Sequence, residues 1–354
     1  MTAGRAVLLL APSRGLGGGI ERYVETLEWA FAAKNVPCRR VNLEQARVDG
    51  HIRMVSDGHA QLRAGTGHTR VVVAHRALLP VGVVLARNEH VDGISVVCHG
   101  NDVWGRRHLV RRGVEDFLMR RPDVRVVAVS SFTAGALLRN APAGVLSPGL
   151  SGTWFETLVE ASVASGHMRV EDKGARIVTA FRLSQWRDKG LPEIMRAVEF
   201  IKRPGIGVIV CGSGVVPDDL KVFLKGHPGC AIRQDLPDRE FARELAAADL
   251  FVLATRTRRG RRASGEGFGL VLLEAQVAGT PVVAPAYAGS HDAHLDAVTG
   301  VTPVDETAES LAKTLDQLLR DRWQLEQMGK QAAEWARACF APELYASRVV
   351  GRLL

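Results

Sequence analysis

A chain of 354 residues is longer than one ordinary hydrophobic core supports, so we expect two domains. Its hydrophobic fraction of 46% and charged fraction of 24% are typical of a soluble globular protein. No apolar stretch approaches a membrane span, and the short apolar run near the amino terminus enters a glycine-rich segment, so we predict a cytoplasmic protein without a signal peptide. The net charge of +8 permits an anionic partner, such as a nucleotide, a phospholipid surface or a nucleic acid.

The cysteines indicate neither a disulfide framework nor a zinc site. They are odd in number, scattered, and show no CxxC spacing. We therefore predict reduced thiols in the core. The five residues are Cys38, Cys98, Cys211, Cys230 and Cys339.

Short apolar, β-branched runs recur along the chain between amphipathic stretches. In the first half these runs are 5–11, 36–43, 70–75, 93–99, 124–130 and 144–148. In the second half they are 176–181, 206–212, 230–234, 249–255, 280–285 and 300–304. Because the runs are continuously apolar rather than alternating, they predict strands buried on both faces, in parallel sheets covered by helices.

The interval 151–174 contains no convincing strand and separates the two sets of runs. This pattern predicts an α/β protein with two doubly wound, Rossmann-like domains, residues 1–160 and 161–337. Ligands bind beyond the carboxyl ends of the strands in such sheets, so the cleft between the domains is the expected site.

One glycine-rich, apolar segment contains just two carboxylates, Glu266 and Glu274, eight residues apart. We expect a helix to begin near Phe268, where Gly267 and Gly269 allow backbone amides to approach a ligand at the positive end of the helix dipole. Eight helical residues span roughly 12 Å, comparable to the reach from a nucleotide's ribose to its attached sugar. Carboxylates accept hydrogen bonds from paired hydroxyls, which both sugars offer.

This segment, EGFGLVLLEAQVAGTPVVAP, resembles the E-x7-E signature of the retaining glycosyltransferases of family 4, which share the GT-B fold. Each further similarity is weak alone, but together and in this order the motifs are highly specific and cover nearly the whole chain. The further segments similar to family motifs are 15–27, 96–104, 126–138 and 179–198. The resemblance implies an acceptor-binding first domain facing a donor-binding second domain across a cleft. It also implies a C-terminal helix, about 338–354, that packs back onto the first domain.

By this resemblance, the protein moves a sugar from a nucleotide-sugar donor to an acceptor hydroxyl with retention of anomeric configuration. Arg182 and Lys189 would hold the donor diphosphate and stabilise the negative charge that grows as it leaves. Glu266 would contact the donor sugar and Glu274 the ribose. The amides expected around the donor are those of Gly267, Phe268, Gly269 and Leu270.

In the first half of the chain, Gly18 and Gly19 follow the first expected strand and immediately precede an expected helix. They do not complete G-x-G-x-x-G, because Ile20 stands where the last glycine is needed, so dinucleotide binding is disfavoured. The resemblance implies that this loop faces the donor phosphates and the acceptor.

His99 ends a strand, and the matching family histidine lies beside the donor sugar and the reacting centre. A satisfied structural histidine is the alternative for His99, and it is the favoured interpretation for His75. Asp102 follows closely and is a candidate to face the sugar or the acceptor.

Three positions depart from the family pattern. Phe181 replaces the glycine usual before Arg182, Gly267 stands where proline is frequent, and Ala288 stands where glycine is common. We expect a changed backbone approach to the phosphates, a looser turn, and altered sugar recognition, respectively.

Two basic stretches remain. The run Arg256–Arg262 places five arginines in seven positions; we expect a loop at the cleft mouth that contacts an acidic acceptor or the donor phosphates, or that is simply solvated. In residues 104–121, arginines share a helix with apolar residues, which suits either peripheral contact with the inner face of an anionic membrane or packing on the first domain. Without a recognised reading module, we expect no nucleic-acid binding.

The sequence has no D-x-D that could bridge a divalent ion to a diphosphate, so we predict a reaction without metal or other cofactor. The resemblance implies that the acceptor attacks from the face the phosphate leaves and that the phosphate takes the proton. It favours a UDP-sugar. The acceptor stays open between a lipid-linked molecule, a small metabolite and a glycan. The alternatives are a nucleotide-sugar epimerase or hydrolase on the same fold and a non-catalytic sugar-nucleotide binding protein.

Overall fold

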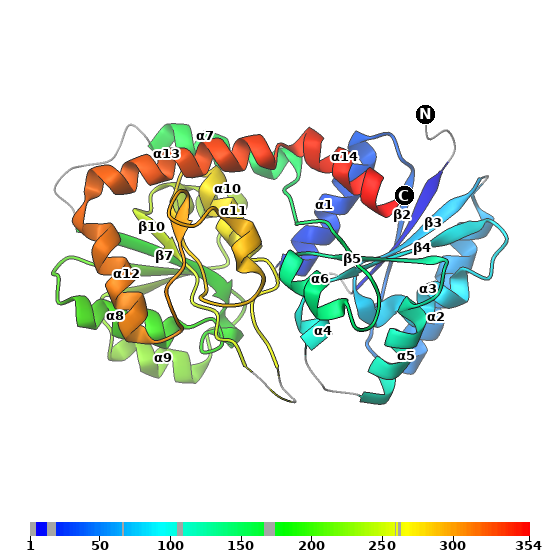
Figure 1. Ribbon diagram of the computed structural model, residues 1–354, viewed down its shortest axis with the longest axis horizontal. Coiled ribbons are helices and arrows are strands. Elements are labelled where there is room, and N and C mark those ends of the chain that lie inside the picture. Colours follow the sequence, from blue (N-terminus) through cyan, green and yellow to red (C-terminus); the bar gives the residue numbers. More distant parts are fainter. Residues whose placement is uncertain are drawn as a thin grey trace.

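The computed structural model describes residues 5–12, 19–65, 67–104, 109–165, 174–258, 260 and 263–354. These residues form two six-stranded sheets, each flanked by helices, which lie side by side along the long axis of the molecule (Figure 1). Every run expected to be a strand contributes one, and the strand pairings are parallel. The predicted fold class, two doubly wound domains of the GT-B type, is confirmed.

The first sheet has the strand order β2-β1-β3-β4-β5-β6. Its strands are β1 (Ala6–Ala11), β2 (Cys38–Asn42), β3 (Thr69–Val73), β4 (Val91–Cys98), β5 (Val124–Ala128) and β6 (Gly144–Val145). Its helices are α1 (Gly19–Ala33), α2 (Val48–Arg63), η1 (Arg76–Leu78), α3 (Leu79–Leu85), α4 (Asn101–Trp104), α5 (Leu109–Met119) and α6 (Ser131–Leu137). The β1 and β3 side chains are almost completely buried, as the continuously apolar runs predict.

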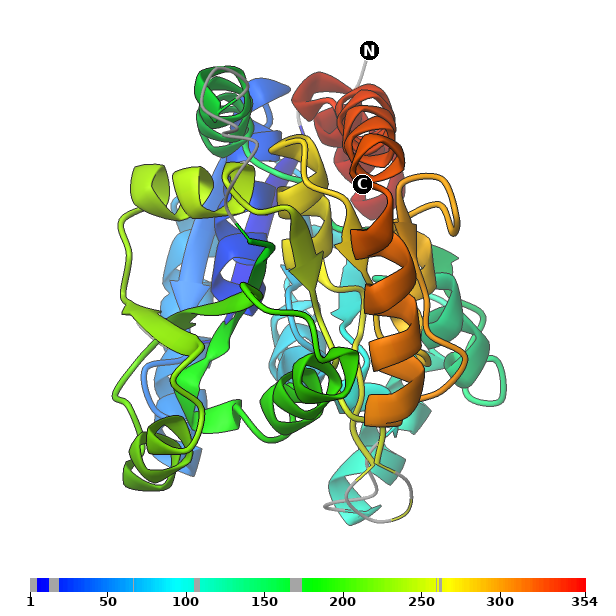
Figure 2. The ribbon, with the colours of Figure 1, turned by 90° about the vertical axis from the view of Figure 1, so that its left-hand side faces the viewer.

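The second sheet has the order β12-β11-β10-β7-β8-β9. Its strands are β7 (Arg176–Arg182), β8 (Gly207–Ser213), β9 (Cys230–Gln234), β10 (Leu250–Val252), β11 (Val282–Val283) and β12 (Gly300–Val301). Its helices are η2 (Leu183–Gln185), α8 (Leu191–Ile201), α9 (Asp218–Lys225), α10 (Asp238–Ala246), α11 (Leu270–Val277), η4 (Gly289–Ala293) and α12 (Ala308–Arg320). Figure 2 shows α12, in orange, on the outside of this sheet.

Three helices connect the two sheets. α7 (Gly152–Ser165) follows the first sheet in sequence but packs on α10 and α11 beside the second. α13 (Arg322–Cys339) contacts α11, and α14 (Pro342–Leu353) then packs on α1 (Figure 1). The chain end is bound to the first sheet, because Ser95 Oγ donates to the carbonyl of Leu353 at 2.7 Å and Arg5 donates to that of Leu354 at 3.0 Å. One apolar core cluster accordingly contains side chains from both halves of the chain, such as Val97 and Phe251.

The helix after the first carboxylate begins later than expected. α11 starts at Leu270, not near Phe268, and Gly269 precedes it in the left-handed region with φ 84°. That conformation is open to glycine but interrupts a right-handed helix. Glu266 therefore lies in an irregular loop, and Glu274 lies little more than one turn into the helix rather than two.

Candidate active site

The first carboxylate is bound to a cation and a hydroxyl from two neighbouring strand ends. Lys189 follows β7 and Thr255 follows β10, and the two strands pair in parallel, so both side chains reach the same edge of the sheet. Lys189 Nζ lies 2.8 Å and Thr255 Oγ1 lies 2.9 Å from Glu266 Oε2. Burial by itself raises the pKa of Glu266, but the charge and hydrogen bond of Lys189, with the Thr255 hydroxyl, outweigh it and place the pKa below its usual value. Two of the expected site residues thus form one ionised cluster.

The loop that carries Glu266 is in direct contact with the first domain. A Cβ atom on Gly267 would lie 2.0 Å from the carbonyl oxygen of His99, so the backbones approach too closely for any other residue. On the other side, a Cβ atom on Gly289 would lie 1.9 Å from the carbonyl oxygen of Gly267. The Gly289 amide donates to the carbonyl of Glu266 at 2.9 Å. Glycines at these positions let the loop lie between the two domains.

Two further contacts close the same boundary. The amide and hydroxyl of Ser131, at the start of α6, both donate to the carboxylate of Asp292 in η4 at 2.6 Å. A Cβ atom on Gly265 would lie 3.2 Å from the ring of Trp104, which itself packs edge-on against Phe132. Residues of both domains therefore touch at the boundary where the cleft is expected.

Arg182 ends β7 and is half-buried. Within the part of the chain that the structure describes, no hydrogen bond or ion pair binds its guanidinium. It does not join the Lys189 cluster through a direct bond, although both follow the same strand. A cation without a protein counter-ion at a strand's carboxyl end is available to an anionic ligand.

Glu274, the second carboxylate, has a different environment. Its side chain is 4% exposed and accepts a hydrogen bond from the indole Nε1 of Trp154 at 2.9 Å. The nearest cation is Arg22 of α1, whose Nε lies 3.6 Å from Glu274 Oε1. Burial raises the pKa of Glu274, and the charge of Arg22 only partly opposes that rise. The two carboxylates of the motif thus have their pKa values shifted in opposite directions.

His99 lies at the carboxyl end of β4, against Tyr23 and His75. Its ring meets that of Tyr23 edge-on at 5.0 Å and is stacked on that of His75 at 6.1 Å. His99 Nε2 lies 2.7 Å from the carbonyl oxygen of Ala74, so this nitrogen carries the hydrogen and Nδ1 is the free acceptor. Burial lowers the pKa of His99, and His75 acts in the same direction. His99 therefore stays neutral at neutral pH.

His75 and Asp102 both bind local backbone. The Nδ1 atom of His75 accepts from the amide of Ala77 and caps η1, so the structural role favoured for His75 is occupied in the structure. Asp102 Oδ1 accepts from the amides of His99 and Gly100, each at 2.9 Å, and holds the turn after β4. The other oxygen, Asp102 Oδ2, is buried without a partner among the described residues.

Of the two loop glycines, Gly18 and Gly19, only the second lies within the described residues. Gly18 lies outside the described residues. Gly19 is the first residue of α1, and a Cβ atom there would meet nothing within 4 Å in the described structure.

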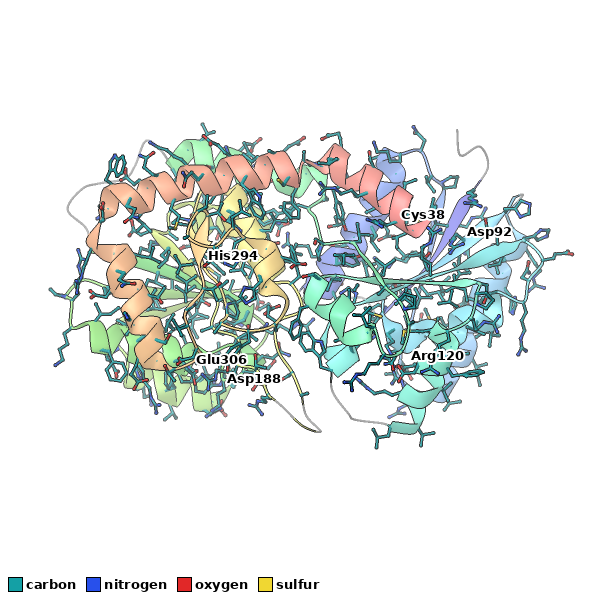
Figure 3. All side chains as sticks on the ribbon, viewed as in Figure 1. Cys38, Asp92, Arg120, Asp188, His294 and Glu306 are labelled. Atoms are coloured by element: carbon teal, nitrogen blue, oxygen red, sulfur yellow. The ribbon has the colours of Figure 1, made fainter. Side chains whose placement is uncertain are left out.

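The arginine run is bound to acids where it is described. Arg256 Nε lies 3.6 Å from Glu193 and 3.8 Å from Glu306, and Arg258 pairs with Asp188. Figure 3 labels Asp188 and Glu306 on the second domain. Arg258 also forms an antiparallel bridge with Ser264. Arg259, Arg261 and Arg262 lie outside the described residues, and their expected contact with an acidic ligand stays a prediction.

Helix α5 leaves several of its apolar residues exposed, although Met119 is buried. Val110 is 86% and Phe117 is 71% exposed, whereas Glu115 is almost fully buried. Glu115 Oε2 pairs with the buried guanidinium of Arg76 at 2.8 Å. The Glu115–Arg76 pair and the buried Met119 therefore lie on the side of α5 that faces the first domain. The exposed apolar residues on this helix are Leu109, Val110, Val114 and Phe117.

Parts of the chain are similar in sequence to known sugar-transferring enzymes. Residues 169–335 match the model of the family glycosyl transferases group 1. A GDP-mannose-dependent alpha-(1-6)-phosphatidylinositol monomannoside mannosyltransferase of Mycolicibacterium smegmatis is 32% identical over 42% of this chain. The chain spans 38% of that relative's length. The protein of the same name from Mycobacterium tuberculosis is 28% identical over 72% of this chain and 68% of its own.

Among solved structures, Anabaena HepE in complex with UDP has the same fold, with a TM-score of 0.72 at 16% identity. The alignment covers 98% of each chain. The likeness therefore spans both domains, and at this identity it concerns the fold alone.

Sequence reasoning missed three side chains that hold the motif's carboxylates. These are Arg22, Trp154 and Thr255. Arg22 lies within the 15–27 segment that resembles a family motif, which is a signal that could have singled it out. Trp154 and Thr255 carry no local signal, because their roles depend on which carboxylate folds against them.

Proposed function

We propose that the protein is a retaining glycosyltransferase that moves a sugar from a nucleotide-sugar donor to an acceptor hydroxyl. The observation that carries this proposal is the cluster of Lys189, Thr255 and Glu266, together with Arg182 at the end of β7, whose guanidinium has no partner among the described residues. All four residues lie within the segment that matches the glycosyl transferases group 1 model. The site provides positive charge for a diphosphate and acceptor oxygens for sugar hydroxyls, which are the two halves of an activated sugar.

In the proposed reaction the acceptor oxygen bonds to the anomeric carbon as the bond from that carbon to the phosphate oxygen breaks. Attack occurs on the face from which the phosphate departs, so configuration is retained, and a phosphate oxygen takes the acceptor's proton. Arg182 and Lys189 stabilise the growing phosphate charge. Glu266 orients the donor sugar, and Glu274 binds the ribose. Neutral His99 offers Nδ1 as an acceptor for a sugar hydroxyl.

The donor is identified by a test without any acceptor. Purified protein is incubated with UDP-, GDP- and dTDP-sugars, and release of the nucleoside diphosphate by slow hydrolysis is followed. The family resemblance favours a UDP-sugar, while the names of the mycobacterial relatives make GDP-mannose the competing donor. An isomerised donor would indicate an epimerase. Binding of the donor without turnover, whichever acceptor is added, would indicate a non-catalytic sensor. Failure to bind every one of these nucleotides would overturn the proposal.

We propose that transfer needs no metal, because the cationic side chains and loop amides take over charge stabilisation. The rate in EDTA should equal the rate in Mg²⁺. Strict loss of turnover in EDTA, restored by Mn²⁺ or Mg²⁺, would contradict this.

The exposed apolar face of α5 supports peripheral contact with an anionic membrane. None of the helices in the described residues is long and apolar enough to cross a membrane. The α5 face instead carries Val110 and Phe117 beside exposed Arg111 and Arg120, the latter labelled in Figure 3. Apolar residues that enter the lipid boundary, flanked by arginines that bind anionic headgroups, are the usual means of interfacial binding. Because the names of these relatives include a phosphatidylinositol mannoside, a lipid-linked acceptor is the first candidate to assay.

A further inference from the structure

An arginine of the first domain contacts the second domain at the carboxylate proposed to bind the ribose. Arg22 lies on α1, and its NH2 donates to Asp238 at the start of α10 at 2.8 Å. Its Cζ atom lies 4.4 Å above the ring of Trp154, and its Nε faces Glu274 at 3.6 Å. One side chain thus connects α1, α7, α10 and α11.

The two carboxylate oxygens of Glu274 differ in their protein contacts. Trp154 Nε1 donates to Oε1 at 2.9 Å, and Arg22 faces the same oxygen. An indole N–H is only a donor, so it fixes Oε1 as an acceptor. In the described part of the chain no donor binds Oε2. The second oxygen therefore keeps its lone pairs for a ligand.

The charge of Arg22 favours the ionised form of Glu274, in which both carboxylate oxygens are acceptors. Burial favours the protonated carboxyl, and Asp238 of α10 adds to that effect. Arg22 is the only cation that opposes it among the described groups that shift this carboxyl, while Trp154 of α7 helps by its hydrogen bond. An ionised carboxylate accepts from two vicinal hydroxyls, whereas a protonated one must donate through one oxygen.

We infer that Arg22 is a positioning residue that reaches across from the first domain and holds Glu274 ready to accept hydrogen bonds from the ribose hydroxyls. The ribose site is then complete only when the two domains are in contact. This inference rests on the proposed function, because it takes a nucleotide as the ligand.

The test compares nucleotides that differ in one ribose hydroxyl. Calorimetry measures the dissociation constants of UDP, GDP and their 2′-deoxy forms for the wild type and for Arg22→Gln, Arg22→Lys and Trp154→Phe. We expect the wild type to prefer the ribonucleotide by about 10- to 100-fold, the effect of one hydrogen bond to a charged group. Arg22→Gln should lose most of that preference, and Arg22→Lys should keep part of it. Arg239→Gln removes the same charge from an exposed neighbour and should change nothing.

The pH dependence separates this role from general support of the fold. The preference for the ribonucleotide should decline as pH falls and Glu274 gains a proton. Without Arg22 the pKa of Glu274 rises further, so the decline should begin at a higher pH in Arg22→Gln. A purely structural arginine would weaken binding of both nucleotides equally and leave the midpoint of the decline unchanged.

Each outcome has a separate meaning. If the wild type binds neither UDP nor GDP, the proposed function fails. If it binds a nucleotide without preferring the ribose form, or if Arg22→Gln retains the full preference, the role of Arg22 is wrong and the proposed function stands. Tighter binding by Arg22→Gln would show that Arg22 occupies the ribose position, which also overturns the inference. If Arg22→Gln does not fold, the same comparison of dissociation constants is made with Arg22→Lys and Trp154→Phe.

Discussion

The two carboxylates at either end of the glycine-rich motif are chemically identical, but the fold shifts their pKa values in opposite directions. Glu266 is bound at 2.8 Å by Lys189 of its own domain, and its pKa is lowered. Glu274 meets its nearest cation at 3.6 Å, from the other domain, and its pKa is raised. For Glu266 the charge and hydrogen bond of Lys189, together with hydrogen bonds from Thr255 and the Gly267 amide, outweigh desolvation. For Glu274 the charge of Arg22 and the hydrogen bond of Trp154 do not. The pKa of Glu266 is thus determined by groups of its own domain, whereas the pKa of Glu274 depends on groups of both domains.

The largest effect is expected at the cation that neither carboxylate neutralises. Because Lys189 already pairs with Glu266, Arg182 is the residue whose charge is free for the leaving phosphate. Arg182→Ala should lower turnover about 100- to 1000-fold, as for the loss of one preorganised donor. Steady-state kinetics or donor hydrolysis measures this. The control is Arg187→Ala, an exposed arginine stacked on Trp186. Unchanged donor affinity and turnover in Arg182→Ala would remove the proposed diphosphate site.

A third buried carboxylate, Glu115, extends the comparison, since it pairs with Arg76 on the inward side of α5 while Val110 and Phe117 of the same helix are exposed. If that face enters lipid, the double substitution Val110→Asp and Phe117→Ser should weaken binding to vesicles containing phosphatidylglycerol by at least about tenfold. Fully burying one such side chain contributes roughly 1.5–3 kcal/mol. Co-sedimentation measures the bound fraction, with phosphatidylcholine vesicles as the neutral reference. Phe200→Ser, at a half-exposed phenylalanine of the second domain, should leave binding unchanged.

Neutralising each motif carboxylate should change the free energy of unfolding in opposite directions. Glu266→Gln leaves Lys189 without its anion and should cost about 1–3 kcal/mol at pH 7.5. Because the folded pKa of Glu266 lies below its unfolded value, this contribution is present above the unfolded pKa and is lost as pH falls through the folded pKa. The gap between wild type and variant should therefore close in acid, measured by urea unfolding.

Glu274→Gln should instead raise the stability of the ligand-free protein by about 1 kcal/mol at pH 7.5, while nucleotide binding weakens. Its folded pKa lies above the unfolded value, so ionising Glu274 costs stability as pH rises between the two. This gain should also vanish in acid. A loss of stability in Glu274→Gln equal to that of Glu266→Gln would contradict the contrast between the two sites.

The smallest effect concerns the loop that supports Glu266. Ala288 precedes η4 with φ 82° and ψ −150°, a region that glycine occupies and other residues avoid. Ala288→Gly should relieve this strain and stabilise the fold by up to about 1 kcal/mol, offset in part by the greater freedom of glycine in the unfolded chain. Differential scanning calorimetry measures the change. A clear fall in melting temperature would show that the methyl group packs usefully here.

Much of the architecture was predictable because it depends on local patterns. Continuously apolar runs mark strands buried on both faces, and every expected strand is present, including the two-residue β11 and β12. The pairing of Lys189 with Glu266 was within reach, because both residues follow strands of one parallel sheet. The start of α11 was not, since the choice of a left-handed Gly269 depends on how the loop meets the first domain.

The sequence alone determined which residues form strands, the division into two sheets and the positions of the motif's carboxylates, because periodicity and burial act over a few neighbouring residues. Only the tertiary structure decided that Arg22 faces Glu274, that Arg76 pairs with Glu115 of α5, and that Glu266 pairs with Lys189. Those outcomes depend on charges that lie far apart in the chain. Electrostatic energies in a buried site change steeply with each ångström, which local sequence patterns do not record.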